Sequence, residues 1–283
     1  MGGRGCKSQQ RPPPIVVPKT QSLEPKAVIV ALTRSVPASI HRCELTHLER
    51  EPIDYARALR EHEVYERCLA EMGCVVERLP DTPDLPDSVF VEDTALVFDD
   101  LAVMARPGAA SRRAEVVSAA EALRTYRRVV FIQPPGTLDG GDVLVTATTV
   151  FVGISARTNA DGARQLAAIL TPAGRRVLAV PVRGGLHLKS AVTAVSDQLL
   201  LVNPAWVDSE AFPGFECAEI DPVEPYAANV LRIGRRVMCA AEFPRTRKRL
   251  EALGIVTTVV HAGELAKAEG GLTCGCLLLS QSS

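Results

Sequence analysis

The sequence predicts a closed, five-bladed α/β propeller, built from ββαβ-like units around a pseudo-fivefold axis. A pattern of strand, tight hairpin, strand, helix and strand recurs at a spacing of roughly 40 to 50 residues, and such a unit cannot bury its apolar faces alone. The two ends of the chain together supply one further unit, which would close the ring. The alternative is an ordinary mixed α/β sandwich, which the same strands also allow.

The folded part is expected to begin near Lys26. Residues 1–25 are rich in Gly, Gln, Pro and Arg, which predicts a disordered tail. Residues 27–32 form a continuous apolar run, short enough for a strand buried on both faces. A helix is predicted over 54–72 from apolar residues at helical spacing, with Gly73 ending it, and a strand over 74–79.

Three further units follow the same order of two strands, a helix and a strand. Their predicted ranges are 92–97, 101–105, 112–126 and 129–132; 140–145, 150–153, 160–170 and 176–180; and 228–233, 237–240, 244–253 and 255–260. A more divergent unit has strands at 190–195 and 198–202. The last unit is split, because residues 276–279 supply its opening strand and residues 26–79 supply the rest. Residues 26–283 are therefore expected to form a single domain.

Composition and charge describe an ordinary globular protein of 283 residues, with 47% hydrophobic residues. The formal net charge is -1, so no overall field recruits nucleic acid or an anionic membrane. No apolar run approaches the roughly 20 residues of a membrane-spanning helix. Residues 11–14 place Arg and three prolines where a signal peptide would have its apolar core, which predicts a cytoplasmic protein.

The eight cysteines indicate reduced thiols. They occur singly or at dissimilar spacings, which fits neither a disulfide framework nor a paired zinc site.

The repeat predicts where the chemistry lies. Polar residues stand immediately before the opening strands of successive units: Glu92 and Asp93, Asp139 within 138–142, His187 within 184–187, and Cys274. In a closed repeat array, equivalent positions point to the same end of the axis. We therefore expect acidic residues, a histidine and a cysteine to meet at one mouth.

Cys274 is predicted to be a nucleophile and His187 its acid/base partner. Glycines at 270, 271 and 275 surround Cys274, and glycines at 184 and 185 precede His187, so both side chains can reach a cleft. The alternatives are a buried structural cysteine and a satisfied core histidine. The other histidines, at 41, 47, 62 and 261, are expected on the surface or at helix caps.

Carboxylates near the thiol point to a cationic substrate, because they would repel a developing oxyanion but accept paired hydrogen bonds from a guanidinium. Asp142 is predicted to be a turn or support residue. Arg112 and Arg157 each stand where a second strand leads into a helix, and both can clamp a substrate carboxylate. Their alternative is a solvated charge at a helix start.

Six motifs in the same order resemble the dimethylarginine dimethylaminohydrolase family, over a region from residue 27 to the end. They lie at 87–93, 106–113, 137–144, 151–159, 185–190 and 272–274. The resemblance implies the pentein propeller fold of the guanidine-modifying superfamily. It also implies a catalytic domain over 26–283 that hydrolyses Nω-methylated arginines to citrulline and a methylamine through a covalent thiouronium on Cys274, with no cofactor required.

Site residues carry over by motif. Cys274 matches the nucleophile, His187 the general acid/base, and Asp139 the carboxylate that supports His187 and the guanidinium. Matches to substrate-binding positions are Leu45 in a lid loop, Asp87, Glu92, Asp93, Ala268, and Arg112 and Arg157 for the α-carboxylate.

Three other readings stay open. An arginine or agmatine deiminase would use the same cysteine, histidine and carboxylates on an unmethylated guanidine. A catalytically idle guanidine-binding or scaffold protein would keep the fold alone. Zinc could bind Cys274 with Cys276 and His187, as an inhibitor, because thiolates bind it readily. We expect a small-molecule guanidine partner and a monomer or homodimer.

Overall fold

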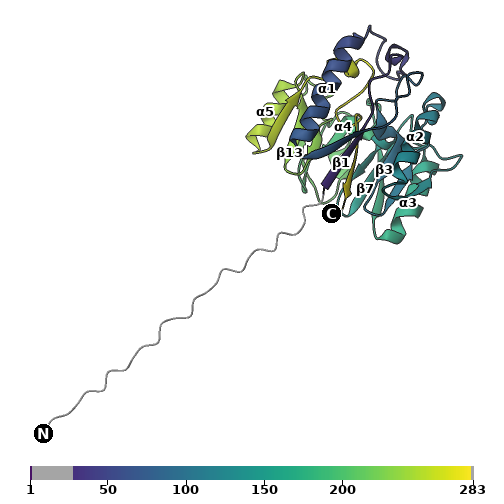
Figure 1. Ribbon diagram of the computed structural model, residues 1–283. Coiled ribbons are helices and arrows are strands. Elements are labelled where there is room, and N and C mark those ends of the chain that lie inside the picture. Colours follow the sequence, from purple (N-terminus) through teal and green to yellow (C-terminus); the bar gives the residue numbers. More distant parts are fainter. Residues whose placement is uncertain (2–27, 282–283) are drawn as a thin grey trace.

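The computed structural model describes Met1 and residues 28–281, and apart from Met1 the predicted disordered tail over 1–25 lies outside the described residues. Five three-stranded sheets make up the β structure (Figure 1). The first strand of each sheet lines one cavity of about 300 Å³. The five sheets therefore surround a common channel, as the repeat predicted.

Every sheet has the same strand order and directions. The first strand is antiparallel to the middle one, and the middle strand is parallel to the outer one. The sheets are β3 (Ala95–Val97), β4 (Leu101–Met104) and β5 (Arg128–Phe131); β6 (Val143–Val145), β7 (Thr149–Ile154) and β8 (Arg176–Pro181); β9 (Val192–Ala194), β10 (Leu199–Val202) and β11 (Glu216–Glu219); β12 (Leu231–Ile233), β13 (Arg236–Ala240) and β14 (Val256–Val260); and β15 (Leu277–Gln281), β1 (Val28–Thr33) and β2 (Cys74–Arg78).

The split unit is confirmed. In the last sheet β15 pairs antiparallel with β1, so that Leu279 lies opposite Val30, and β1 pairs parallel with β2. Figure 1 shows β15, in yellow, beside β1, in purple. Pairing the two ends of the described chain closes the ring and leaves no blade incomplete.

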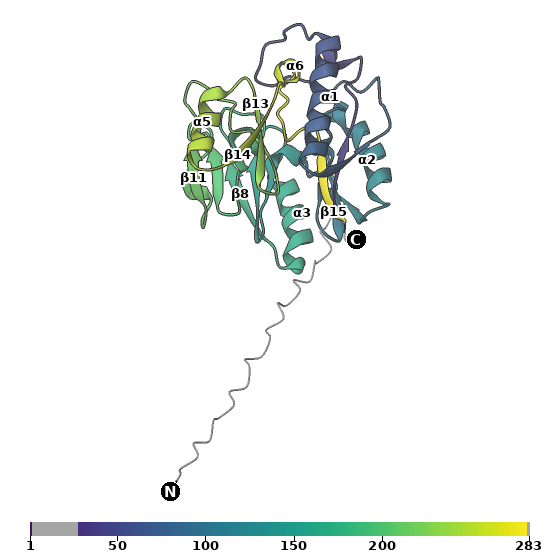
Figure 2. The ribbon, with the colours of Figure 1, turned by 60° about the vertical axis from the view of Figure 1, so that its left-hand side comes forward.

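Four helices connect a middle strand to the next outer strand, and they cover the outside of the ring (Figure 2). They are α1 (Tyr55–Glu71), α2 (Glu115–Leu123), α3 (Ala160–Leu170) and α5 (Pro244–Ala252). The Asp54 side chain caps α1 by accepting from the Arg57 N–H, and Asn159 caps α3 through the Gly162 N–H. Gly73 follows α1 with a φ of 100°, a left-handed conformation that suits glycine.

The apolar core lies between neighbouring blades and under the helices. One cluster joins Leu32 of β1, Leu277 of β15, Met104 of β4 and Leu123 of α2. A corresponding cluster joins Val103 of β4 with residues of β6, β7 and α3. Successive blades are therefore held by side chains shared across each boundary.

The opening strands begin later than predicted. Residues at the start of the predicted strands 92–97, 140–145 and 190–195 form short helical turns instead, which are η2 (Val91–Thr94), η4 (Gly140–Asp142) and α4 (Leu188–Ala191). Side chains in these turns therefore do not alternate across a sheet, and Glu92 and Lys189 line the channel itself.

Other boundaries also differ. The predicted helix 112–126 is a 3-10 turn, η3 (Ala110–Ala114), followed by the shorter α2. The divergent unit contains only η6 (Ser209–Ala211) between β10 and β11 among the described residues. The 3-10 turns η1 (Ile40–Arg42) and η5 (Thr171–Ala173) and the short helix α6 (Gly263–Ala266) complete the elements. Every described helix is too short or too polar to cross a lipid bilayer.

The structure tests the predictions made for the cysteines and for His62. The seven described cysteines are free thiols. His62 was expected on the surface or at a cap, but it is buried in α1, where it lies near Glu66 and stacks on Tyr65. His62 lies within the predicted helix 54–72, on the buried face that also carries Tyr65 and Leu69.

Candidate active site

Cys274 lies in a tight turn between α6 and β15. Its N–H donates to the Gly271 carbonyl (3.2 Å), and the Gly271 N–H donates to its Sγ (3.3 Å). The Tyr65 hydroxyl donates to the Leu272 carbonyl (2.9 Å), and a Cβ on Gly275 would lie 2.9 Å from the Tyr65 ring. The glycines therefore let residues 268–276, called the nucleophile loop, pack against α1, and Cys274 is 8% exposed.

His187 lies at the start of α4 and is held by carboxylates. Its Nε2 is 3.1 Å from Asp139 Oδ2, and its Nδ1 is 3.8 Å from Asp93 Oδ1. Asp139 Oδ1 accepts a hydrogen bond from the Gly108 N–H (2.8 Å). Asp142, predicted to be a turn or support residue, is fully buried and accepts from the Leu188 N–H (2.9 Å). It thereby fixes the start of α4 next to the imidazole.

The two glycines after Asp139 have a structural reason beyond a turn. A Cβ on Gly140 would lie 1.9 Å from the Glu92 carbonyl oxygen, and one on Gly141 would lie 2.6 Å from His187 Nδ1. The Gly141 N–H also donates to Asp93 Oδ1 (2.8 Å). Glycine at these positions allows two blades and the imidazole to approach one another closely.

Arg112 is buried, and carboxylates surround it. Its Nη1 donates to Asp93 Oδ2 (2.5 Å), its Nε and Nη2 donate to Glu115, and its Nη2 also donates to the Asp87 and Phe90 carbonyls. These partners raise the pKa of Arg112 well above its usual value despite burial. Arg112 therefore stays charged and closely tied to its neighbours.

Arg157 is less fully engaged. Its Nη2 donates to the Thr46 hydroxyl (2.9 Å), whereas its buried Nη1 lies 3.6 Å from Asp139 Oδ2 and has no hydrogen-bond partner among the described residues. A buried guanidinium nitrogen without a partner is costly, and an anionic ligand would satisfy it. Of the two predicted carboxylate-binding arginines, Arg157 has the donor available.

The cluster shifts several pKa values. Burial favours neutral His187, but Asp93, Asp139 and Asp142 outweigh it and raise the pKa of His187 to about 9. Burial raises the pKa of Cys274 to about 12, and Glu92 and Asp93 add to this. The pKa of Asp93 lies below its usual range because His187 and Arg112 outweigh its burial. At neutral pH the pair is a thiol and an imidazolium.

Glu92 lies beneath the nucleophile, not in the mouth. Its carboxylate accepts from Lys189 Nζ (2.5 Å) and from the Thr273 hydroxyl (2.6 Å), and its backbone N–H donates to the Cys274 carbonyl (3.1 Å). Glu92 and Lys189 line the channel cavity of about 300 Å³ on the far side. Their ion pair forms part of the floor between that channel and the site.

The mouth itself is one small cavity. Seven of the ten predicted site residues line it, namely Asp87, Asp93, Arg112, Arg157, His187, Ala268 and Cys274. Asp139 lies behind His187, Glu92 lies below Thr273, and Leu45 packs on the apolar cluster around Cys274. The cavity measures about 10 Å³, which is room for about one water. The mouth is therefore closed in this structure.

Residues 43–50, called the lid segment here, contribute to this closure. The Glu44 N–H donates to both Asp87 carboxylate oxygens (3.2 and 3.1 Å), and the Ser111 hydroxyl donates to Glu44 Oε1 (2.5 Å). Thr46 accepts from Arg157. The lid segment thus contacts groups on several sides of the mouth.

One group of donor atoms among the described residues is close enough to hold a metal ion: Asp93, Asp139 and His187, with one atom from each within 4.8 Å of the others. These atoms already contact one another or Arg112. Cys274 is not part of this group.

A sequence model of the arginine deiminase family matches residues 81–233. The dimethylarginine dimethylaminohydrolase of Streptomyces coelicolor is 44% identical over 232 residues, covering 81% of this chain and 89% of that protein. The chain belongs to the dimethylarginine dimethylaminohydrolase family.

Solved structures of this family share the fold. A mutant of the dimethylarginine dimethylaminohydrolase from Pseudomonas aeruginosa, complexed with citrulline, superposes with a TM-score of 0.82 at 36% identity, covering 89% of this chain and 98% of that one. A dimethylarginine dimethylaminohydrolase adduct with S-methyl-L-thiocitrulline gives the same TM-score, identity and coverage. The five-bladed pentein prediction is thereby confirmed.

Sequence reasoning missed several residues that hold this dimethylarginine dimethylaminohydrolase site together. Glu115 and Asn229 lie outside the six motifs, and the motif that contains Lys189 did not identify Glu92 as its partner. Asn229 accepts from the Thr273 N–H (3.0 Å) and donates to the Thr273 hydroxyl (3.1 Å), so it secures the turn before Cys274. The glycine-rich sequence near Cys274 indicated close packing, but nothing in it identified the partner.

Proposed function

We propose that the chain hydrolyses Nω-methylated arginines to citrulline and a methylamine. The observation that carries the proposal is the single buried cavity in which the Cys274 thiol and the His187 imidazole meet Asp87, Asp93 and Arg157. Its carboxylates suit a guanidinium and an ammonium group, and its free guanidinium nitrogen suits a carboxylate. These are the charged groups of a methylated arginine. Family membership supports the same activity.

In the first half-reaction, the substrate guanidinium enters beside Asp93, while Asp139 stays behind His187. Its positive charge offsets the carboxylates that hold the proton on Cys274, so the thiol loses that proton to solvent. The thiolate attacks the guanidinium carbon and gives a neutral tetrahedral species. His187, already an imidazolium, donates its proton to the substituted nitrogen. The methylamine departs and leaves a cationic S-alkylthiouronium on Cys274.

In the second half-reaction, neutral His187 takes a proton from water, and the hydroxide attacks the thiouronium carbon. The C–S bond then breaks, the former water oxygen becomes the carbonyl oxygen of citrulline, and its second proton returns to the sulfur. Asp139 keeps the imidazole oriented through both steps by its bond to Nε2.

The supporting residues have proposed roles. Asp87 would bind the substrate α-amino group and Arg112 and Arg157 its α-carboxylate, with backbone contacts from Leu45 and Ala268. Glu92 would act from below, through Thr273 and the Cys274 backbone. Residues 26–283 would form one catalytic domain. We also propose a cytoplasmic monomer or homodimer that needs no cofactor and that zinc inhibits at Cys274.

An arginine deiminase activity is the second candidate, because the family model that matches residues 81–233 is that of arginine deiminase. The two activities share every proposed residue and differ in the substituents on the guanidine.

The deciding experiment measures citrulline and amine release from asymmetric dimethylarginine, with monomethylarginine, arginine and agmatine run alongside. Preferred turnover of the methylated substrates is expected. Ammonia release from arginine or agmatine in preference would keep the mechanism and replace the substrate. Absence of turnover with all four, by a chelator-treated folded enzyme, would overturn the catalytic proposal.

A further inference from the structure

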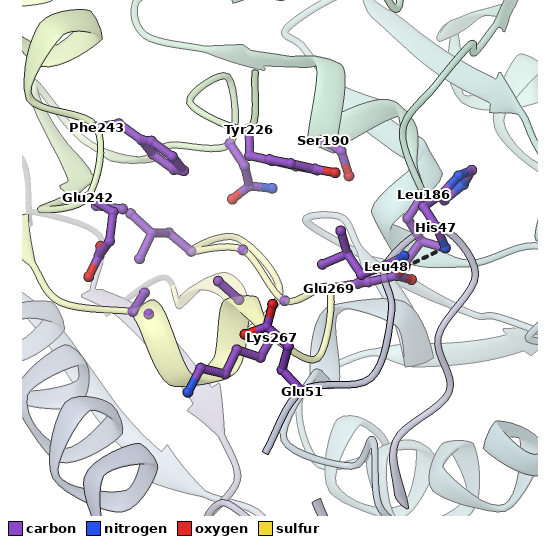
Figure 3. Close-up of a pocket in the computed structure, with 18 of the residues that line it drawn as sticks. His47, Leu48, Glu51, Leu186, Ser190, Tyr226, Glu242, Phe243, Lys267 and Glu269 are labelled. Carbon is purple, nitrogen blue, oxygen red and sulfur yellow. Dashed lines mark hydrogen bonds between the residues drawn. The ribbon is translucent and has the colours of Figure 1, made fainter. Parts of the chain in front are cut away.

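Glu269 contacts the lid segment through three of its backbone N–H groups. Its carboxylate accepts hydrogen bonds from three consecutive backbone N–H groups: Thr46 (3.1 and 3.0 Å), His47 (2.5 Å) and Leu48 (2.7 Å). Figure 3 shows Glu269 next to His47 and Leu48. A carboxylate surrounded by successive amides is a strong, charge-assisted arrangement.

The backbone at Glu269 is unusual as well. Its φ is 59°, and it is the one non-glycine residue with positive φ among the described residues. A side chain with a Cβ disfavours this conformation, and such strain persists where the surrounding structure enforces it. The N–H groups of Glu269 and Gly270 donate to the Ala266 and Leu265 carbonyls, which fixes the turn. The strained turn directs the carboxylate from the nucleophile loop to the lid segment.

Glu269 differs in one respect from two of the other groups that contact the lid segment, Asp87 and Arg157. Asp87 and Arg157, which also hold the lid segment, are the groups proposed to bind the substrate ends. A bound substrate would compete for both. The Glu269 contact uses a group for which the mechanism has no other use, so it can persist while substrate is bound.

Space for movement lies beside this contact. A cavity of about 270 Å³, lined mostly by apolar side chains, has Leu48, Tyr226, Phe243 and Glu269 in its wall (Figure 3). Because the mouth cavity holds about one water, a methylated arginine enters only if the lid segment moves. A displaced Leu48 would have apolar surface nearby to cover.

We propose that Glu269 is a positioning residue that holds the lid segment closed over bound substrate and releases it for entry and exit. The identity of the substrate that enters under the lid segment rests on the proposed function. The role of Glu269 in holding the lid segment does not. Breaking the contact exposes Cys274, whatever the substrate is.

The test is the size dependence of Cys274 alkylation in the free enzyme. Wild type, E269Q and E269A are treated with iodoacetamide and with a bulky fluorescent maleimide, and labelling of the Cys274 peptide is followed by mass spectrometry. The ratio of the bulky rate to the small rate isolates access from thiol reactivity. We expect this ratio to rise about tenfold in the variants, as loss of charge-assisted bonds implies.

E242Q is the matched control, because Glu242 lines the same 270 Å³ cavity and has no hydrogen bond to the lid segment. Its ratio should match wild type. E269G removes the carboxylate and relieves the backbone strain, so it keeps the test available if E269A fails to fold. With asymmetric dimethylarginine, the E269 variants should lose about tenfold in kcat/KM, chiefly through KM. An unchanged labelling ratio in folded E269A or E269G, or an equal rise in E242Q, overturns the proposal even if turnover is absent.

Discussion

The nucleophile loop (residues 268–276) and the acid/base cluster around His187 both line the mouth, and nearby carboxylates raise the pKa of each, which keeps Cys274 neutral but His187 charged. Burial, Glu92 and Asp93 raise the pKa of Cys274 to about 12, which keeps it neutral. Burial opposes charge on His187, but Asp93, Asp139 and Asp142 raise its pKa to about 9, which keeps it positive. Asp93 contributes to both shifts.

Because of this difference, His187 and Cys274 reach their reactive protonation states at different stages of the reaction. The acid is ready before substrate arrives, since His187 is protonated at neutral pH. The nucleophile is not ready, because its thiolate would lie among carboxylates. A cationic substrate supplies the missing positive charge, so the negative site activates the thiol only in the presence of a guanidinium.

The largest effect is expected from C274S. A serine hydroxyl is a far weaker nucleophile than a thiolate, so citrulline formation should fall by at least about 10⁴-fold. The fold should stay intact, because the Cys274 main-chain bonds to Gly271 and Glu92 do not depend on sulfur. Citrulline assay and circular dichroism check the two parts. Near-normal turnover by C274S would remove Cys274 from the mechanism.

H187Q is expected to cost about 10² to 10⁴-fold in kcat, because it removes the proton donor for the amine and the base for water. KM should change little. Since thiouronium hydrolysis also needs the base, a covalent adduct on Cys274 should accumulate and be visible by intact-protein mass spectrometry. H261Q is the control, as His261 is exposed and pairs with Glu242. Equal losses in H187Q and H261Q would argue against a chemical role.

D93N changes the charge that both halves share. Removing this anion should lower the pKa of Cys274 and that of His187 together. A fall of about one unit in the pKa of Cys274 would raise the thiolate fraction about tenfold at pH values well below 11. The thiolate is measured by ultraviolet titration of D93N against D93N/C274S, and His187 by NMR.

D142N sharpens that measurement. Asp142 raises the pKa of His187 but is not among the main charges acting on Cys274. D142N should therefore lower the pKa of His187 and leave that of Cys274 in place. If D93N and D142N shift the pKa values of both Cys274 and His187 to the same extent, the substitutions act by loosening the site as a whole and not through the individual charges.

Local signals in the sequence predicted the fold, but they did not predict where the opening strands begin. Apolar runs and helix stops predicted α1 and α3 to within a residue or two because burial and capping are local. The opening strands were predicted too early, since turns such as Val91–Thr94 and Gly140–Asp142 are fixed by contacts between blades. The bond from the Gly141 N–H to Asp93 spans 48 residues and leaves no periodic trace in the sequence.

The active site likewise contains residues that the sequence predicted and partners that it did not. The residues that bear the chemistry stood in recognisable motifs with glycines beside them. Their pairings could not be predicted: Lys189 lies in the motif at 185–190 but pairs with Glu92 across 97 residues, and Glu269 contacts Leu48 across 221. A lysine after a histidine and a glutamate before two glycines are ordinary on their own. Only the ring closure brings these partners together.

The smallest expected effect tests how firmly α1 holds the nucleophile loop. Y65F removes the hydroxyl that donates to the Leu272 carbonyl and leaves that buried oxygen without this partner, which should cost about 1 kcal/mol of unfolding free energy. Because Leu272 lies two residues before Cys274, kcat should also fall a few-fold. Urea unfolding and steady-state kinetics measure the two quantities.

Y126F is the control, since the Tyr126 hydroxyl bonds to Glu77 in an exposed position away from the mouth. A Y65F enzyme with lower stability but unchanged kcat would mean that the turn from Gly271 to Cys274 orients the thiol alone, and that α1 supports the fold of the loop without aiming its nucleophile.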